Sequence, residues 1–331
     1  MAGEHLIMSA PITLQARADD YLAERRRLGF ALRSQDTLLA DFATFVTDRH
    51  HDGPLTVEVM VDWVRRGQAG LGTWETWYRR MAKLRPFIRY LQQFEPHTEI
   101  PEDAIFGPEP GRVAPHIYRE DEIVALLDAT RQLGPPGSLR PATFETLFGL
   151  MAATGLRVCE AIHLQDADVD LKRGMLTVRE SKFAKSRQVP LHPSTVDALV
   201  RFRRLRRRDV PTTGDTPFFT GSRGRRLGQA LGERQVHRVL NRLRDRLNWV
   251  NRGAHAAPRL HDLRHTFAVR RLVAWHREGA DLDQMMLALS TYLGHTKIAH
   301  TYWYLSAVPE LMALAGDKFE RFVALGGADD E

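Results

Sequence analysis

Apolar residues recur at helical spacing through the first hundred residues of the chain. Leu38, Phe42, Phe45 and Val46 follow the i, i+4, i+7, i+8 pattern of one helix face, and Ser34 is placed to cap the start of that helix. The segments "ADDYLAERRRLGF" and "VEVMVDWV" are further candidate helices, and the helix that opens at Thr73 has an apolar stripe in "TWETWYRRMAKL" and a kink predicted at Pro86. This pattern predicts a bundle of about four helices.

A proline-rich stretch follows the predicted bundle. Residues 96–115 contain five prolines, at 96, 101, 108, 110 and 115, and such a segment cannot continue a helix. We therefore expect a helical domain over residues 1–95, a linker over 96–115 and a second domain over 116–331.

The pattern in the second domain changes between helix and strand periods. "YREDEIVALLDAT" is an amphipathic helix, and "TFETLFGLMAAT" is typical of a buried helix that ends at Gly155. "GMLTVRE" and "SRQVPLH" predict a β-hairpin with Lys182 in or beside its turn. The remainder, from Pro193 to Leu325, is mostly helical. The expected fold class is mostly α with a small β-sheet: an N-terminal helical bundle and an α+β second domain.

Positive charge is concentrated in two segments. The 331-residue chain is 43% hydrophobic with a net charge of +6, yet residues 201–208 hold six arginines and residues 223–246 hold eight more. Such clusters favour contact with a polyanion, and a solvated helix face is the alternative. The side chains in these segments expected to contact a nucleic acid are Arg201, Arg203, Arg204, Arg223, Arg225 and Arg226, and Lys185 on the predicted hairpin is a further candidate.

The single cysteine, Cys159, cannot form an internal disulfide, which suits a reducing compartment. The chain has no run of about 18 apolar residues and no secretory leader pattern. The expectation is a cytoplasmic protein with no membrane partner.

A basic cluster lies at the start of one predicted helix, "RLHDLRHTFAVRRLVAWHREG". His261, Arg264 and His265 share a face at the N-terminal end of this helix, where the helix dipole already favours anions. Phosphate is therefore the expected ligand. Scattered surface charge is the alternative. A zinc site is disfavoured because Asp262 replaces the glutamate of a zincin motif and Arg264 repels cations, so no metal is expected.

Three tyrosines occur within "STYLGHTKIAHTYWYLS", residues 290–306. Tyr302 and Tyr304 are two apart, which is about 200° around a helix, so both cannot face one phosphate. Tyr292 precedes a break at Gly294.

Four motifs occur in a fixed order: "TGLRVCEAIHL", "SKFAKSRQVPLH", "HDLRHTFA" and "YLGHTKIAHTYWYL". Their order and spacing resemble the tyrosine recombinases, the phage integrase family, over about residues 115–325. The helical first domain and proline-rich linker are also similar to the core-binding domain and hinge of that family, although there the likeness is one of architecture.

Glu160, three residues after Arg157, is placed to hold its guanidinium from behind, and a simple surface ion pair is the alternative. His265 is expected in a similar supporting position, and the resemblance implies the catalytic residues. An ungapped alignment of "SKFAKSRQVPL" favours Lys182 over Lys185. Since two arginines can hold phosphate oxygens, no cofactor is needed. His261 is the candidate base, with His295 assisting and Lys182 protonating the leaving oxygen. The implied catalytic residues are Arg157, Lys182, His261, Arg264, His295 and Tyr304.

The implied activity is site-specific recombination of double-stranded DNA through a covalent 3′-phosphotyrosine, for integration, excision or transposition. Self-association into a dimer or tetramer on DNA is expected, with accessory recombination proteins as further partners. The amphipathic helix after Tyr304 either packs on its own domain or docks on a neighbouring protomer. The alternatives are a type IB topoisomerase-like nicking-closing enzyme and an inert DNA-binding regulator.

Overall fold

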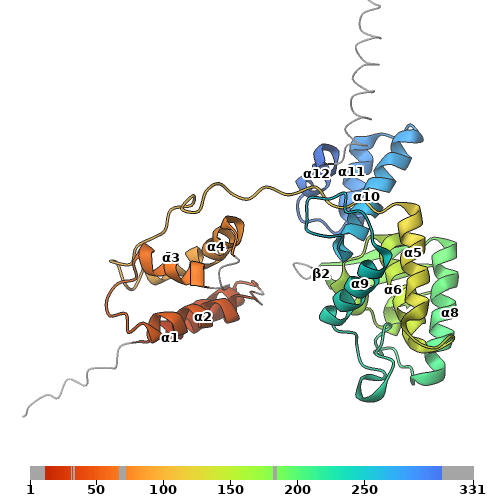
Figure 1. Ribbon diagram of the computed structural model, residues 1–331, viewed down its shortest axis with the longest axis horizontal. Helices are drawn as coiled ribbons and strands as arrows, with labels where there is room; N and C mark the ends of the chain where they lie inside the picture. The colour runs from red at the N-terminus through yellow and green to blue at the C-terminus, as the bar shows by residue number, and fades with distance from the viewer. Residues whose placement is uncertain (1–11, 31, 33, 67–71, 182–184, 308–331) are drawn as a thin grey trace, which may run out of the picture. The chain divides into compact units, whose positions relative to one another are not determined.

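The chain divides into two compact units, Met1–Arg112 and Val113–Glu331, in a computed structural model that describes residues 12–30, 32, 34–66, 72–181 and 185–307 (Figure 1). Within those ranges, no helix is both long and apolar enough to cross a membrane.

Four helices lie in the described residues of the first unit, as the pattern predicts: α1 (Leu14–Arg27), α2 (Gln35–Asp48), α3 (Val57–Arg66) and α4 (Trp74–Leu91). Their apolar faces meet in one core around Phe42, Trp63 and Phe87. One expectation was wrong in detail: Ser34 precedes α2 but makes no side-chain cap, because its backbone is already in the helical region. Pro86, where a kink is predicted, lies inside α4.

The proline-rich segment is anchored at both ends. The Arg85 guanidinium, on α4, donates to the carbonyl oxygens of Pro101 and Glu102 at 3.0 and 2.8 Å. Farther along, the Ala254 amide donates to the carbonyl oxygen of Ala114 at 2.9 Å. The part of the proline-rich segment without these attachments is therefore shorter than the predicted linker, residues 96–115.

The second unit is built around α6 (Leu139–Thr154), whose buried residues include Phe144, Leu147, Phe148 and Met151. Around it pack α5 (Glu120–Thr130), α8 (Pro193–Asp209) and α10 (Leu260–Arg277). The remaining helices are α7 (Val158–Ile162), α9 (Glu233–Leu247), α11 (Leu282–Leu293) and α12 (Ala299–Ala307), with 3₁₀ turns η1 (Arg131–Leu133), η2 (Asp166–Asp168) and η3 (Gly224–Arg226).

A three-stranded antiparallel sheet has the order β1 (Val169–Asp170), β2 (Met175–Ser181), β3 (Lys185–Pro190). The strands β2 and β3 form the predicted hairpin, with Leu176 opposite Val189 and Val178 opposite Arg187. The two-residue strand β1 is too short for an alternating pattern to reveal. The turn that carries Lys182, and the predicted amphipathic helix after Tyr304, lie outside the described residues.

Candidate active site

Two helices of the second unit end at glycines with left-handed backbones, Gly155 after α6 and Gly294 after α11, with φ of +64° and +67°. A Cβ atom would lie 2.7 Å from the Phe267 ring at Gly155 and 2.9 Å from the Arg187 guanidinium at Gly294. Only glycine fits both the backbone and the space. These two helix ends present carbonyl oxygens to the arginines described below.

Arg264 lies in the first turns of α10 and is 1% exposed. It donates to the carbonyl oxygens of Gly155 at 2.8 Å and Leu293 at 2.6 Å, where the negative ends of two helix dipoles favour a cation. No carboxylate of the described residues lies within 4 Å of it. Burial, followed by repulsion from Arg157, lowers the pKa of Arg264 to about 9. Arg264 is thus a buried cation without a paired carboxylate.

Arg157 is the N-cap residue of α7 and faces the same helix ends. Its guanidinium donates to Glu160 Oε1 at 2.7 Å and lies 3.4 Å from the carbonyl oxygen of Gly294. The Glu160 carboxylate is thereby placed behind Arg157, the position that the sequence suggested.

Arg187, on β3, was not singled out from the sequence. It donates to both Glu160 oxygens at 3.0 and 2.9 Å and to the carbonyl oxygen of Tyr292 at 2.8 Å. Burial would raise the pKa of Glu160, but the hydrogen bonds and charges of Arg187 and Arg157 lower it to about 2. The available signal was strand alternation, which puts Arg187 on the same face as the buried Val189.

Three histidines lie near these arginines. His261 and His265 are stacked edge to face on α10 with ring centroids 4.7 Å apart, and His295 shares a 2.7 Å hydrogen bond between Nδ1 and the Thr301 hydroxyl. Desolvation, followed by the charge of Arg264, lowers the pKa of His261 and brings that of His295 to about 3. His261 keeps an exposed side, so the charge repulsion is the firmer cause there. The rings are neutral at pH 7.

The tyrosines have different environments. Tyr304 is 2% exposed, and its hydroxyl lies 3.0 Å from Nδ1 of His265 on α10. Tyr302 is 38% exposed, and its hydroxyl donates to Asp283 at 3.3 Å. Tyr292 stacks on Phe267, and burial raises its pKa to about 12. Of the three, Tyr304 is the one whose hydroxyl contacts a histidine, and that histidine directly follows Arg264 in the chain.

The arginines of α8 do not form one basic face, and Arg203, one of the expected DNA contacts, differs from its neighbours. Arg203 donates to the carbonyl oxygens of Asp166 and Val169 at 3.1 and 2.7 Å and pairs with the Asp166 carboxylate, which directs it into the protein. Arg201 and Arg204 are exposed, as are the predicted contacts on the loop around η3, Arg223, Arg225 and Arg226. For Lys185 the structure describes the backbone alone.

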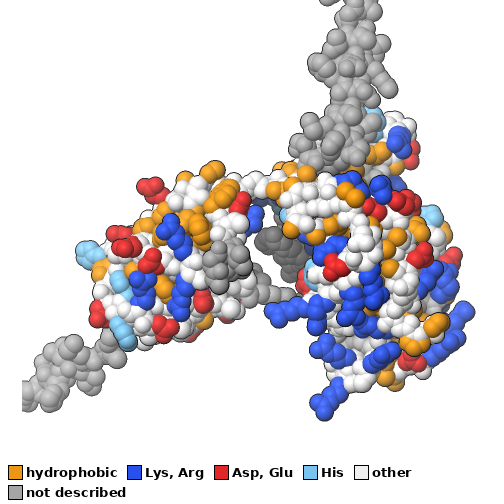
Figure 2. Space-filling model, in the orientation of Figure 1, with side chains coloured by type: hydrophobic (Ala, Val, Ile, Leu, Met, Phe, Trp, Pro, Cys, Tyr) orange, Lys and Arg blue, Asp and Glu red, His pale blue; other side chains and the backbone are white. Residues whose placement is uncertain are grey.

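A further row of arginines emerges on α9. Arg234, Arg238, Arg242 and Arg246 are exposed and recur every fourth residue, which puts them along one side of the helix. Figure 2 shows basic side chains gathered over this part of the second unit. The four-residue period of these arginines is present in the sequence, where the number of arginines alone was used to predict contact with a polyanion.

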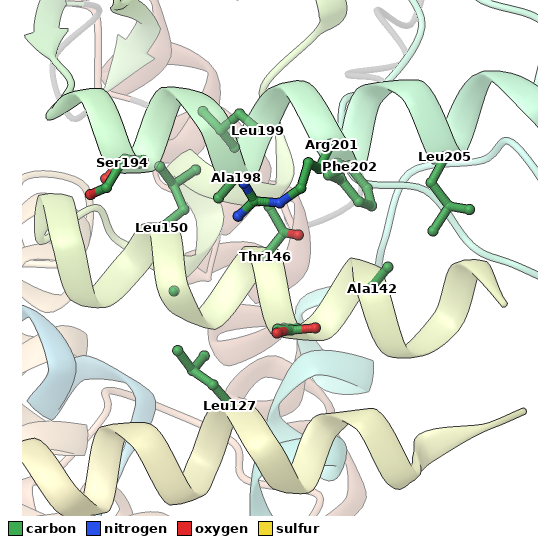
Figure 3. Close-up of a pocket in the computed structure, with 13 residues that line it drawn as sticks. Leu127, Ala142, Thr146, Leu150, Ser194, Ala198, Leu199, Arg201, Phe202 and Leu205 are labelled. Carbon is green, nitrogen blue, oxygen red and sulfur yellow. The ribbon is translucent and has the colours of Figure 1, made fainter. Parts of the chain in front are cut away.

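A groove of about 360 Å³ lies between α5, α6 and α8 (Figure 3). Its lining is largely apolar, with Leu127, Leu150 and Phe202 among the residues, and the Arg201 side chain extends over it. None of the arginines, histidines or tyrosines described around Arg264 lines this groove, so it is separate from that cluster.

The cluster combines fixed cationic donors, neutral imidazoles and one phenol. Guanidinium groups held from behind by carbonyls and a carboxylate suit a phosphodiester, whose charge grows toward the transition state. A phenol beside a neutral imidazole suits nucleophilic attack on that phosphorus. Among the described residues no group of three or more His, Cys, Asp or Glu is arranged to hold a metal ion.

Comparisons with known proteins agree with this chemistry. The model of the phage integrase family matches residues 117–310. The chain is 36% identical to a protein of Sinorhizobium fredii (strain NBRC 101917 / NGR234) with the provisional name integrase/recombinase y4rB, over 93% of this chain and 98% of that protein. It is 30% identical to the tyrosine recombinase XerC of Pelobacter propionicus, over 85% and 86% of the two chains.

Among solved structures, the fold is similar to that of the Tn1549 transposon integrase in complex with transposon right end DNA, with a TM-score of 0.65 at 15% identity over 94% of this chain and 99% of that one. It is also similar to a lambda integrase dimer bound to a core site, with a TM-score of 0.60 at 18% identity over 86% and 96%. The chain therefore belongs to the phage integrase family and is a tyrosine-type site-specific recombinase.

Proposed function

We propose that this recombinase cleaves and rejoins double-stranded DNA through a covalent 3′-phosphotyrosine at Tyr304, for the integration, excision or transposition of DNA. The observation that carries the proposal is the convergence of Arg157, Arg264 and His295 at the carboxyl ends of α6 and α11, with the Tyr304 hydroxyl against His265, the residue that follows Arg264 on α10.

The scissile phosphate binds between the guanidinium groups of Arg157 and Arg264. Some N–H groups of each guanidinium already donate hydrogen bonds to protein atoms, so the orientation of both side chains is fixed before DNA binds. The positive charges of Arg157 and Arg264 exceed the one negative charge of Glu160, and the bound phosphate offsets the difference. Neutral His261 and His295 add hydrogen bonds to the phosphate oxygens.

Tyr304 attacks the phosphorus, and the 5′-oxygen leaves with a proton from Lys182. Because one ester replaces another, a 5′-hydroxyl can reverse the reaction without ATP. A 5′-hydroxyl from a second DNA strand gives strand exchange, which requires two sites held together by a dimer or tetramer of the protein. The dimer in which lambda integrase binds its core site supports this assembly.

DNA lies across both units in this proposal, with the helical first unit and the second unit acting as a clamp joined by the proline-rich segment. Exposed arginines of the α8, η3 and α9 regions contact phosphates outside the cleavage site. Such contacts set affinity and its dependence on salt and do not by themselves read sequence.

The test is capture of the covalent adduct. The protein is incubated with nicked DNA fragments from the chromosomal neighbourhood of its coding region, denatured, and the attached DNA ends are sequenced. Wild type and Tyr302→Phe should form an adduct with a 3′-phosphotyrosine, whereas Tyr304→Phe should form none while it still binds DNA. An adduct in Tyr304→Phe that is lost in Tyr302→Phe contradicts the assignment. Exchange between two paired sites, as opposed to relaxation of supercoils alone, separates a recombinase from a nicking-closing enzyme.

A further inference from the structure

We propose that His265 is the catalytic base that accepts the proton of the Tyr304 hydroxyl as the phenol attacks the DNA phosphate. The proposal rests on the proposed function of Tyr304 and deepens it, because the sequence suggested His261 for the base and gave His265 only a supporting position.

The contact is direct and enclosed. Nδ1 of His265 lies 3.0 Å from the Tyr304 hydroxyl, with the two rings inclined by 66° and their centroids 5.5 Å apart. The Trp303 ring covers another side of the imidazole at 5.7 Å, edge to face. Tyr304 itself is 2% exposed, so solvent has little access to this proton. A base within hydrogen-bond reach of the nucleophile meets the first geometric requirement for proton transfer.

His265 is in the protonation state that the role requires. Burial, and after it the positive or potentially positive groups His261, Arg259, Arg264 and His295, lower its pKa to about 2. A neutral imidazole accepts at one nitrogen and donates at the other, so a phenol that donates to Nδ1 implies the Nε2–H tautomer. The ring can therefore receive a proton at the nitrogen that faces Tyr304.

DNA binding makes this base stronger at the moment of use. The groups that repel a proton on His265 include Arg264, which the proposed function places against the scissile phosphate. The negative charge of that phosphate attracts a proton and raises the basicity of the imidazole, since an opposite charge nearby favours the charged form. Burial, the largest cause of the low pKa, remains when DNA is bound, so the phosphate raises the basicity of His265 only in part.

The step balances in atoms and charge. The Tyr304 oxygen forms a bond to phosphorus, its proton moves to Nδ1 of His265, and the bond from phosphorus to the 5′-oxygen breaks. The leaving oxygen takes its proton from a different group, which the proposed function identifies as Lys182. In the rejoining step a 5′-hydroxyl attacks phosphorus and gives its proton to the neutral Lys182, the bond from phosphorus to the Tyr304 oxygen breaks, and the protonated His265 returns its proton to the departing phenol.

The test compares His265→Gln with His276→Gln in single-turnover cleavage of the mapped DNA site from pH 6 to 9. Glutamine keeps a hydrogen-bonding oxygen but is no base, and His276 is a histidine of the same helix, in its last turn. At pH 7 His265→Gln should cleave about 10²–10³-fold more slowly than wild type, and His276→Gln should match it. Between pH 7 and 9 the His265→Gln rate should rise about tenfold per unit as phenolate forms by ionisation in solution, while wild type stays nearly flat.

Each outcome decides the matter. A His265→Gln rate equal to that of wild type overturns the proposal. A faster rate also overturns it, because it means that His265 restrains the phenol. A rate that is equally low at every pH overturns it as well, because it indicates a structural role. A second readout needs no DNA: Tyr304→Phe should shift the Nδ1 resonance of His265 in ¹⁵N NMR, and an unchanged resonance also overturns it. If wild type forms no adduct at all, the proposed function fails first, and the NMR result still reports on the contact.

Discussion

Arg206 and Arg264 are both buried arginines of the second unit, yet their charges are balanced differently. Arg206 on α8 is 0% exposed, pairs with the Asp166 carboxylate, and donates to the carbonyl oxygens of Pro217 and Phe218 at 3.1 and 3.0 Å. Arg264 is 1% exposed and donates to two carbonyl oxygens, but no carboxylate of the described residues lies within ion-pair distance.

This difference separates an arginine used for folding from one available for binding. A buried ion is costly unless an opposite charge compensates it, and Asp166 compensates Arg206 within the protein. At Arg264 the dipoles of two helix ends give partial compensation, and in the proposed function a DNA phosphate offsets the remaining charge. Burial alone does not distinguish the two arginines. The presence or absence of a carboxylate within ion-pair distance does.

The strongest way to break this comparison is to replace each arginine with methionine. Arg264→Met should lower adduct formation by about 10³-fold or more, since the scissile phosphate loses a fixed donor pair, and should lower the free energy of unfolding by no more than about 2 kcal/mol. Arg206→Met should do the reverse: near-normal cleavage per folded molecule and a loss of about 3 kcal/mol or more.

Adduct yield after single turnover and urea unfolding measure the two effects. If Arg264→Met is the less stable of the two proteins, the distinction between a folding arginine and a binding arginine does not hold.

A weaker perturbation removes the carboxylate that Arg157 and Arg187 share. Because the pKa of Glu160 is lowered to about 2, its ionised form stabilises the fold fully above its unfolded value near 4.5, and that stability is lost as pH falls through about 2. Glu160→Gln should therefore lower the free energy of unfolding at pH 7, by an amount that shrinks between pH 4.5 and 2. It should also reduce cleavage, since Arg157 loses its support.

Urea unfolding across this pH range measures the change, with Glu145→Gln as the control. Glu145 pairs with Arg131 at the surface, where an ion pair contributes at most about 1 kcal/mol. An equal effect of the two substitutions at every pH would count against a special role for Glu160.

The smallest expected effect distinguishes neighbouring arginines of α8. Arg204→Gln, at an exposed position, should reduce the slope of log affinity against log salt by about 1 and leave unfolding unchanged. Arg203→Gln should leave the slope unchanged and lower stability, because Arg203 pairs with Asp166. Fluorescence anisotropy with labelled duplex at several salt concentrations gives both slopes; if Arg203→Gln changes the slope and Arg204→Gln does not, the assignment of the two side chains is reversed.

Periodicity predicted the helices well because α2, α4 and α6 each bury an apolar stripe that local sequence carries. Local sequence also indicated that Glu160 would lie behind Arg157, since residues three apart in a helical turn are neighbours. It could not reveal the contact between His265 and Tyr304 or the contacts of Arg187 with Glu160 and Tyr292, because these join segments up to 105 residues apart. The inward turn of Arg203 depends on Asp166, which is 37 residues away in sequence.

The carbonyl oxygens at the ends of α6 and α11 have a consequence for the order of folding. Gly155, which holds Arg264 in place, precedes it by 109 residues, and Leu293 follows it by 29. The carbonyl contacts of Arg264 therefore form only once α6, α10 and α11 have packed together. If Arg264 binds the scissile phosphate as proposed, cleavage requires a fully folded second unit, whereas a partly folded chain retains only its surface arginines.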